Sequence, residues 1–148
     1  MIFDSTLEFC DATAILLTAG TTAVVGNVVD LGAVQRDIGA GRSAYLVLSV
    51  NTSFTAGNGA TFKLTSDSAA ALTTTPTDHW TSAALTSTTG VAGKKFVIPL
   101  PAGNAVPYQR YLGIRQTNGA TTAFTAGAID AFIAFSPSAF AFSADAVN

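Results

Sequence analysis

The residues that most often carry out chemistry are nearly absent from this chain. Its 148 residues include one cysteine and one histidine, Cys10 and His79. A single cysteine excludes an internal disulfide framework. The nine Asp and Glu residues are scattered along the sequence and lack the spacing of a calcium-binding loop. We therefore expect no catalytic residues, no metal site and no cofactor, which makes an enzyme the least favoured class of function.

Charge is scarce as well. Charged residues make up 11% of the chain and leave a net charge of −2, whereas about 25% is usual. The one basic cluster, Lys94-Lys95, is too small to follow a nucleic-acid backbone, so no nucleic-acid partner is expected. Charged residues are depleted at the centres of protein interfaces. A surface of Thr, Ser, Ala and Gly therefore favours permanent contacts with other subunits.

Long apolar runs are missing too. Runs such as residues 14–17 and 131–135 have no more than five residues, whereas a membrane-spanning helix needs about 20 apolar residues. No basic segment followed by an apolar stretch opens the sequence, so we expect no signal peptide. Membrane insertion is not favoured as the reason for the low charge, and no membrane partner is expected.

Alternating apolar and polar residues indicate an all-β fold in one domain, residues 1–148. Residues 12–19 are the one stretch that suits a helix. Short strands separated by turns predict an antiparallel β-sandwich, most simply jelly-roll-like, with short terminal arms. The predicted strands are residues 6–10, 24–31, 44–52, 61–67, 95–100, 110–117 and 127–135, with an eighth near 80–85.

Three of these strands have predictable places in a sheet. Residues 44–52 are apolar on both faces, which indicates a central strand that is covered on both sides. Residues 61–67 alternate and predict one buried and one wet face. In residues 95–100, Pro99 cannot donate a ladder hydrogen bond and therefore marks an edge strand or a bulge.

The phrase Phe-Thr-Ala-Gly occurs twice, at residues 54–57 and 124–127, each time between two strand-like runs. We expect two strand–loop–strand units. Phe54 and Phe124 would plug equivalent ends of the sandwich, and the glycine of each phrase would permit the turn.

Two polar positions require a choice between chemistry and structure. A catalytic interpretation of His79 needs Asp78 to orient the ring and a serine nucleophile. Adjacent residues of a strand or turn point apart, so a loop histidine without a catalytic role is favoured. Asp130 lies within an apolar strand and needs a partner if it is buried. Arg115 or Arg110, in the preceding strand of the same expected hairpin, could supply one.

Contacts with other chains have two kinds of candidate residue. Arginines near residues 36–42 could hold a neighbouring chain through bidentate contacts, or they could be solvated. Apolar residues close to both termini could pack on their own sandwich or dock on a partner. The candidate interface residues are Ile2, Phe3, Arg36, Asp37, Arg42, Phe140 and Phe142.

Several segments, in this order and spacing, carry a resemblance to a known family. They are LEFCDA (7–12), VDLG (29–32), RDIGAG (36–41), YLV (45–47), FTAG (54–57 and 124–127), FVIPLP (96–101) and RYL (110–112). Together they resemble the jelly-roll capsid cement, or decoration, proteins of short-tailed tailed bacteriophages. Cys10 departs from the serine expected at its position.

The resemblance implies a structural virion protein without enzymatic activity. It implies a homo-oligomer, a dimer or trimer at symmetry axes, that binds the outer surface of the capsid and staples neighbouring major capsid subunits. Synthesis would take place in the host cytoplasm. The alternative is a receptor- or glycan-binding head or tail-fibre domain, since such domains share this fold. Its candidate sugar-stacking residues are Trp80, Tyr108 and Tyr111.

Overall fold

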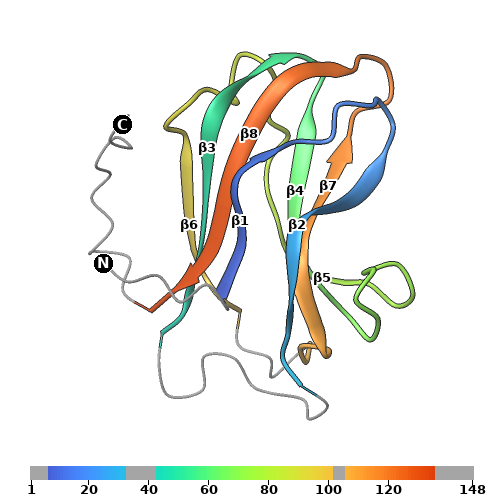
Figure 1. Cartoon of the computed structure of the whole chain (residues 1–148), viewed down its shortest axis with the longest axis vertical. Coiled ribbons are helices and arrows are strands. Elements are labelled where there is room, and N and C mark those ends of the chain that lie inside the picture. The colour runs from blue at the N-terminus through green and yellow to red at the C-terminus, as the bar shows by residue number, and fades with distance from the viewer. Residues whose placement is uncertain (1–6, 33–42, 102–105, 136–148) are drawn as a thin grey trace.

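The computed structural model describes residues 7–32, 43–101 and 106–135, and over these ranges it contains eight β-strands and no α-helix. Two four-stranded antiparallel sheets pack face to face (Figure 1). The expected β-sandwich is confirmed. The strands are β1 (Glu8–Ala14), β2 (Thr22–Asp30), β3 (Tyr45–Ala56), β4 (Ala60–Asp67), β5 (Thr77–Thr81), β6 (Lys95–Pro99), β7 (Tyr111–Asn118) and β8 (Phe124–Ala134).

The strand order is that of a jelly roll. One sheet has the order β1-β8-β3-β6 and the other has the order β2-β7-β4-β5. The first strand therefore pairs with the last, the second with the seventh, the third with the sixth and the fourth with the fifth. This nesting is what results when one long antiparallel ribbon is rolled into two sheets.

Two predicted elements differ from the structure. The strand predicted near residues 80–85 is β5, which lies earlier, at Thr77–Thr81. Leu85 makes only an isolated bridge to Ala60. The helix expected over residues 12–19 is wrong, because β1 continues to Ala14. Its backbone bonds to another strand: Thr13 is in register with Ile129 of β8. Tertiary pairing overrides the local preference of an alanine-containing segment.

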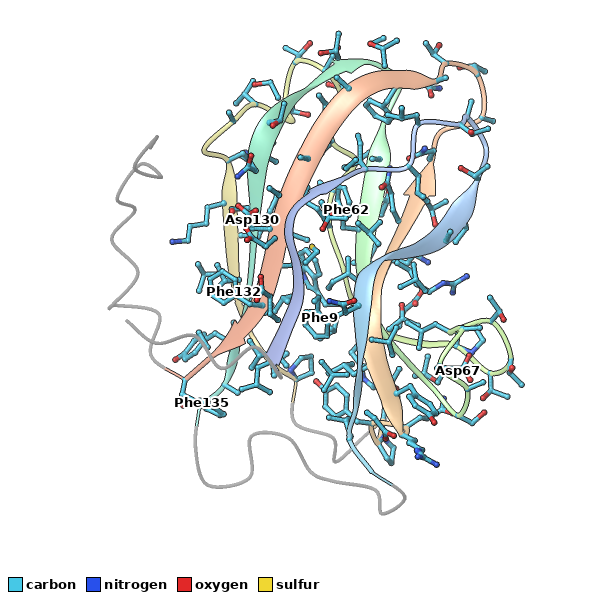
Figure 2. The ribbon with its side chains drawn as sticks, viewed as in Figure 1. Phe9, Phe62, Asp67, Asp130, Phe132 and Phe135 are labelled. Carbon is cyan, nitrogen blue, oxygen red and sulfur yellow. The ribbon has the colours of Figure 1, made fainter. Side chains whose placement is uncertain are left out.

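The core lies between the two sheets and is built from the inward residues of each strand. Phe9, Leu46, Phe62, Ile114 and Ile129 are fully buried there, and Figure 2 shows Phe9 and Phe62 in this interior. Burying one side chain of this size stabilises the fold by about 1.5–3 kcal/mol. The alternation that predicted the strands is thus the pattern that fills the core.

The predicted places of three strands can be compared with the structure. β3 is central and covered on both sides, since Val47 and Ser49, which point away from the core, are also buried. β6 is an edge strand, as Pro99 indicated. The wet face predicted for β4 is only partly correct, because Thr65 and Asp67 are fully buried while Lys63 remains partly exposed.

The two Phe-Thr-Ala-Gly phrases pair with each other instead of forming separate loops. Residues 54–56 end β3 and residues 124–127 begin β8, with Thr55 opposite Ala126 and Ala56 opposite Phe124. The rings of Phe54 and Phe124 meet edge to face, with centroids 5.5 Å apart. The expectation that they plug two equivalent ends is wrong, because both close the same end of the sandwich. We call it the ring end.

Each glycine of the repeated phrase makes room for the phenylalanine of the other copy. A Cβ atom on Gly57 would lie 2.3 Å from the Phe124 ring, and one on Gly127 would lie 2.6 Å from the Phe54 ring. Gly57 follows β3 at a φ of 76°, which agrees with the turn expected there. Gly127 lies inside β8, so its predicted role in a turn is wrong.

Candidate functional site

The seven candidate interface residues lie outside the described ranges of the chain. They belong to residues 1–6, 33–42 and 136–148. The candidates are Ile2, Phe3, Arg36, Asp37, Arg42, Phe140 and Phe142. What the structure does place is the strand ends next to these segments.

These strand ends gather at one end of the sandwich. In one sheet, the start of β3 at Tyr45 is paired with the end of β8 at Ala134. The start of β1 at Glu8 is paired with Phe132, two residues before Ala134. In the other sheet β2 ends at Asp30, which is paired with Tyr111 at the start of β7. All three segments therefore join the described sandwich at the end opposite the ring end (Figure 1).

A buried carboxylate organises that end. Asp67, the last residue of β4, is fully buried (Figure 2). It accepts hydrogen bonds from the backbone amides of Ala69, Thr74 and Thr75 at 2.9–3.1 Å, and from the hydroxyls of Ser68 and Thr75. Burial alone would raise the pKa of Asp67, but these donors outweigh it and lower the pKa below its usual value. The ionised carboxylate fixes the loop between β4 and β5.

A second buried network lies beside it. Ser66 Oγ accepts a hydrogen bond from the backbone N–H of Gln109 at 3.1 Å and lies 2.7 Å from His79 Nε2. The His79 ring stacks on Tyr108 with centroids 4.0 Å apart, and Tyr108 donates its hydroxyl proton to the carbonyl of Pro101. Burial lowers the pKa of His79, against a smaller opposing effect of Asp78. We call the end of the sandwich that holds Asp67 and this Ser66–His79 network the polar end.

The Ser66–His79 contact has the geometry of a nucleophile and its base, but Ser66 has no exposed surface. Asp78 faces the other side of β5 and binds Lys63 and Thr65, so it does not orient the imidazole. The contact joins β4, β5 and the segment before β7. His79 lies in strand β5 and not in the expected loop. Its partner could have been found from sequence, because strict alternation after Phe62 places Ser66 on the same inward face.

The partner expected for Asp130 is different from the one found. β7 and β8 belong to different sheets, so neither Arg115 nor Arg110 can pair with it. Asp130 instead accepts hydrogen bonds from the Ala12 amide at 2.7 Å and the Ser49 hydroxyl at 3.1 Å. These bonds hold β1 and β3 on either side of β8. The role is structural.

Arg110 has a different partner. It forms a bidentate pair with Asp30, at 3.0 and 2.8 Å, on the surface between β2 and β7. The guanidinium lowers the pKa of Asp30, with help from the Gly32 amide.

The three candidate sugar-stacking aromatics do not form one platform. Tyr108 is buried, and Trp80 packs across the interior against Phe96, with ring centroids 6.0 Å apart. Tyr111 is partly exposed and carries the Arg110 guanidinium over its ring at 4.9 Å.

Other kinds of site were considered within the described residues. No three His, Cys, Asp or Glu side chains there lie close enough to hold a metal ion. None of the described segments forms a helix that is long and apolar enough to cross a membrane. Cys10 is buried, and burial together with the Asp130 charge raises its pKa to about 12, so the thiol stays protonated and unreactive.

Similarity to known proteins is found at the level of a family. No curated protein matches the chain. The model of the Bbp16 family, which is phage-related, matches residues 9–133 and so covers all eight strands except the first and last residues of the sandwich. Because this match spans most of the sequence, the chain belongs to the Bbp16 family.

Proposed function

We propose that this protein is a capsid cement protein that binds the outer surface of a phage capsid and staples neighbouring major capsid subunits. Membership of a phage-related family supports a role in a virion. The jelly-roll topology and the order of the sequence segments agree with the family that the chain resembles. A chain with 11% charged residues suits a surface that other subunits cover.

The observation that carries the proposal is the convergence of strand ends at the polar end. Every segment with a candidate interface residue is anchored there, next to Glu8, Asp30, Tyr45 or Ala134. These segments would therefore make their contacts from chain that leaves the sandwich at one end. A protein attached by one end can bridge two capsid subunits without deforming its own core.

The protein would act as a homo-oligomer, a dimer or trimer placed at symmetry axes. Each copy then repeats the same contact, and modest contacts add through multivalency. An interface of this kind buries about 1,200–2,000 Å². The proposed location is the outer capsid surface, after synthesis in the host cytoplasm.

The test uses capsids that lack this protein. Such shells should assemble but release their DNA at a lower temperature than complete virions, and adding the purified protein should restore resistance. Deleting residues 1–6 or replacing Arg36→Ala should weaken this rescue. The deletion stops before Leu7, because Phe9 is fully buried in the core and its loss would unfold the sandwich. Bare and decorated shells of equal resistance, or protein found only at the tail of virions, would favour the receptor-binding alternative.

A further inference from the structure

The outer face of the β2-β7-β4-β5 sheet carries an unbalanced pair of positive charges. Arg115 of β7 is directly opposite Lys63 of β4, and both side chains are partly exposed. Side chains paired in this way point to the same side of the sheet, with Cβ atoms about 4.5–5.5 Å apart. Like charges at this distance repel each other, so the pair needs negative charge nearby.

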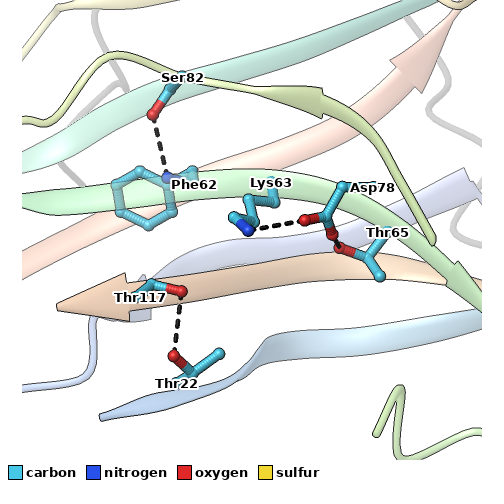
Figure 3. A network of polar contacts seen from close by, with 7 residues as sticks. All are labelled: Thr22, Phe62, Lys63, Thr65, Asp78, Ser82 and Thr117. Atoms are coloured by element: carbon cyan, nitrogen blue, oxygen red, sulfur yellow. Dashed lines mark hydrogen bonds and ion pairs between the residues drawn. The ribbon is translucent and has the colours of Figure 1, made fainter. Parts of the chain in front are cut away.

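Only one carboxylate bonds to this pair in the described part of the chain. Asp78 of β5 binds Lys63 with an Nζ–Oδ2 distance of 2.6 Å and also accepts from the Thr65 hydroxyl (Figure 3). The two ion pairs among the described residues are this one and Arg110–Asp30. Arg115 belongs to neither. Among the described residues, two cations thus share one anion, and one positive charge is left over.

Within the described residues, the Nε atom of the Arg115 guanidinium also lacks a hydrogen-bond partner. Its Nε atom is buried, and no group in the described residues accepts a hydrogen bond from it. A buried donor without an acceptor costs free energy. The terminal Nη groups of an arginine fit a carboxylate with two parallel hydrogen bonds, which would balance the charge.

The surroundings of Arg115 would accept a polar group. Two residues along β7, Thr117 is hydrogen-bonded to Thr22 of β2 at 3.0 Å (Figure 3). Two residues the other way is Gly113, where an added Cβ atom would lie 2.8 Å from the Leu72 side chain. Along β7, Arg115 therefore lies between the Thr117 hydroxyl, which bonds to Thr22, and Gly113, which has no side chain and is covered by Leu72.

We propose that Arg115, with Lys63 beside it, binds an acidic side chain of the major capsid subunit. This inference rests on the proposed function and adds a second contact surface, at the middle of the outer face of the β2-β7-β4-β5 sheet. A second copy of the chain is disfavoured as the partner in a two-fold contact, because the same face would bring two Arg115–Lys63 pairs together and add to the repulsion. A capsid subunit with an exposed Asp or Glu has the complementary charge.

The test measures binding of the purified protein to shells that lack it, at several NaCl concentrations. Arg115→Gln should weaken binding by roughly tenfold to a hundredfold, the size expected for a hydrogen-bonded charge. It should also reduce the dependence of binding on salt, because one screened charge pair is lost. Arg115→Lys keeps the charge but lacks the planar guanidinium, so its affinity should lie between those of the wild type and Arg115→Gln.

The matched control is Lys94→Gln, which removes one positive charge just before β6 of the other sheet, near Phe96. It should bind within about twofold of the wild type. Thermal melting shows that each variant is folded, and Arg115→Lys serves if Arg115→Gln is not.

The outcomes separate this inference from the proposed function. If the wild type binds shells and Arg115→Gln binds them with the same affinity and salt dependence, the inference is overturned and the cement function still stands. Wild-type protein that binds no shell at any salt concentration overturns both. A change in the mass of the free oligomer by light scattering, with capsid binding unchanged, would place the acidic group on a second copy and overturn the choice of partner.

Discussion

The two ends of the sandwich are closed by different chemistry. At the ring end, Phe54 and Phe124 meet edge to face and each fills space left by the glycine of the other copy. At the polar end, the Asp67 carboxylate and the Ser66–His79 contact hold the connecting segments through hydrogen bonds. Apolar packing does not depend on pH. The hydrogen bonds of an ionised carboxylate depend on pH, because protonation removes its charge.

The two ends also differ in the segments that they connect. The ring end joins strands by short connections, for example three residues between β3 and β4. The polar end anchors the segments that hold the candidate interface residues, and it contains the loop that Asp67 organises. The Asp67 carboxylate fixes this loop through hydrogen bonds to its backbone amides, while Leu72 of the same loop is fully buried.

The largest expected effect comes from breaking the ring end. Phe54→Ala and Phe124→Ala should each lower the free energy of unfolding by about 3–5 kcal/mol, because each removes a buried ring and leaves a cavity. Chemical denaturation measures the change. The double variant should show coupling of about 0.5–1.5 kcal/mol from the ring contact.

Phe135→Ala is the matched control, since that ring is 56% exposed. It should change the free energy of unfolding by less than about 0.5 kcal/mol. Equal stabilities for the two buried-ring variants and the control would show that the repeated phrase is not a structural element.

Filling the glycine positions of the same end should have the next largest effect. Gly127→Ala places a Cβ atom 2.6 Å from the Phe54 ring and 2.8 Å from Ile15. Overpacking of this kind costs about 1–3 kcal/mol. Gly93→Ala is the control, because its φ of 84° is also positive but no atom lies within 4 Å of the added Cβ. A larger loss for Gly127→Ala, measured by denaturation, separates crowding from backbone strain.

At the polar end the sharpest test is Asp67→Asn. The amide replaces one acceptor oxygen with a donor that faces backbone N–H groups, so we expect a loss of about 1–3 kcal/mol at neutral pH. The folded-state pKa of Asp67 is lowered, so the unfolded chain takes up its proton first as the pH falls below about 4. Wild-type stability should therefore decrease in that range.

The Asn variant should lose its share of this acid dependence. Asp11→Asn, at an exposed residue, is the control and should leave the stability at neutral pH nearly unchanged. An identical acid profile for wild type and Asp67→Asn would contradict the role given to this carboxylate.

Much of the sandwich could be predicted because strands with one buried face show a period of two. Phe62 and Leu64 of β4 are an example: both are fully buried, and their spacing alone indicates a strand. The central place of β3 followed from Val47, which is apolar where an outward residue would usually be polar. These are local patterns, and local patterns can be read from one sequence.

The errors concern contacts between residues that are distant in the sequence. Asp130 bonds to the Ala12 amide 118 positions away, and that bond helps to draw residues 12–14 into β1 and away from a helix. The pairing of Phe124 with Ala56 likewise depends on the order of strands in the sheets. The expectation that Arg115 or Arg110 could pair with Asp130 rests on sequence adjacency, which fails when consecutive strands lie in different sheets.

The smallest expected effect is that of His79→Ala. The variant loses the contact with Ser66 and the stacking on Tyr108, which should cost about 0.5–1.5 kcal/mol and leave binding to capsids unchanged. Burial lowers the pKa of His79, so below about pH 6.5 the unfolded chain binds a proton before the folded protein does. Wild-type stability should therefore fall as the pH drops below that value, while His79→Ala should be flat there until the carboxylates begin to titrate. Equal slopes for the two proteins between pH 6.5 and 5, in denaturation at a series of pH values, would show that the imidazole does not contribute to the polar end. Loss of capsid binding by a fully folded His79→Ala would contradict a purely structural role.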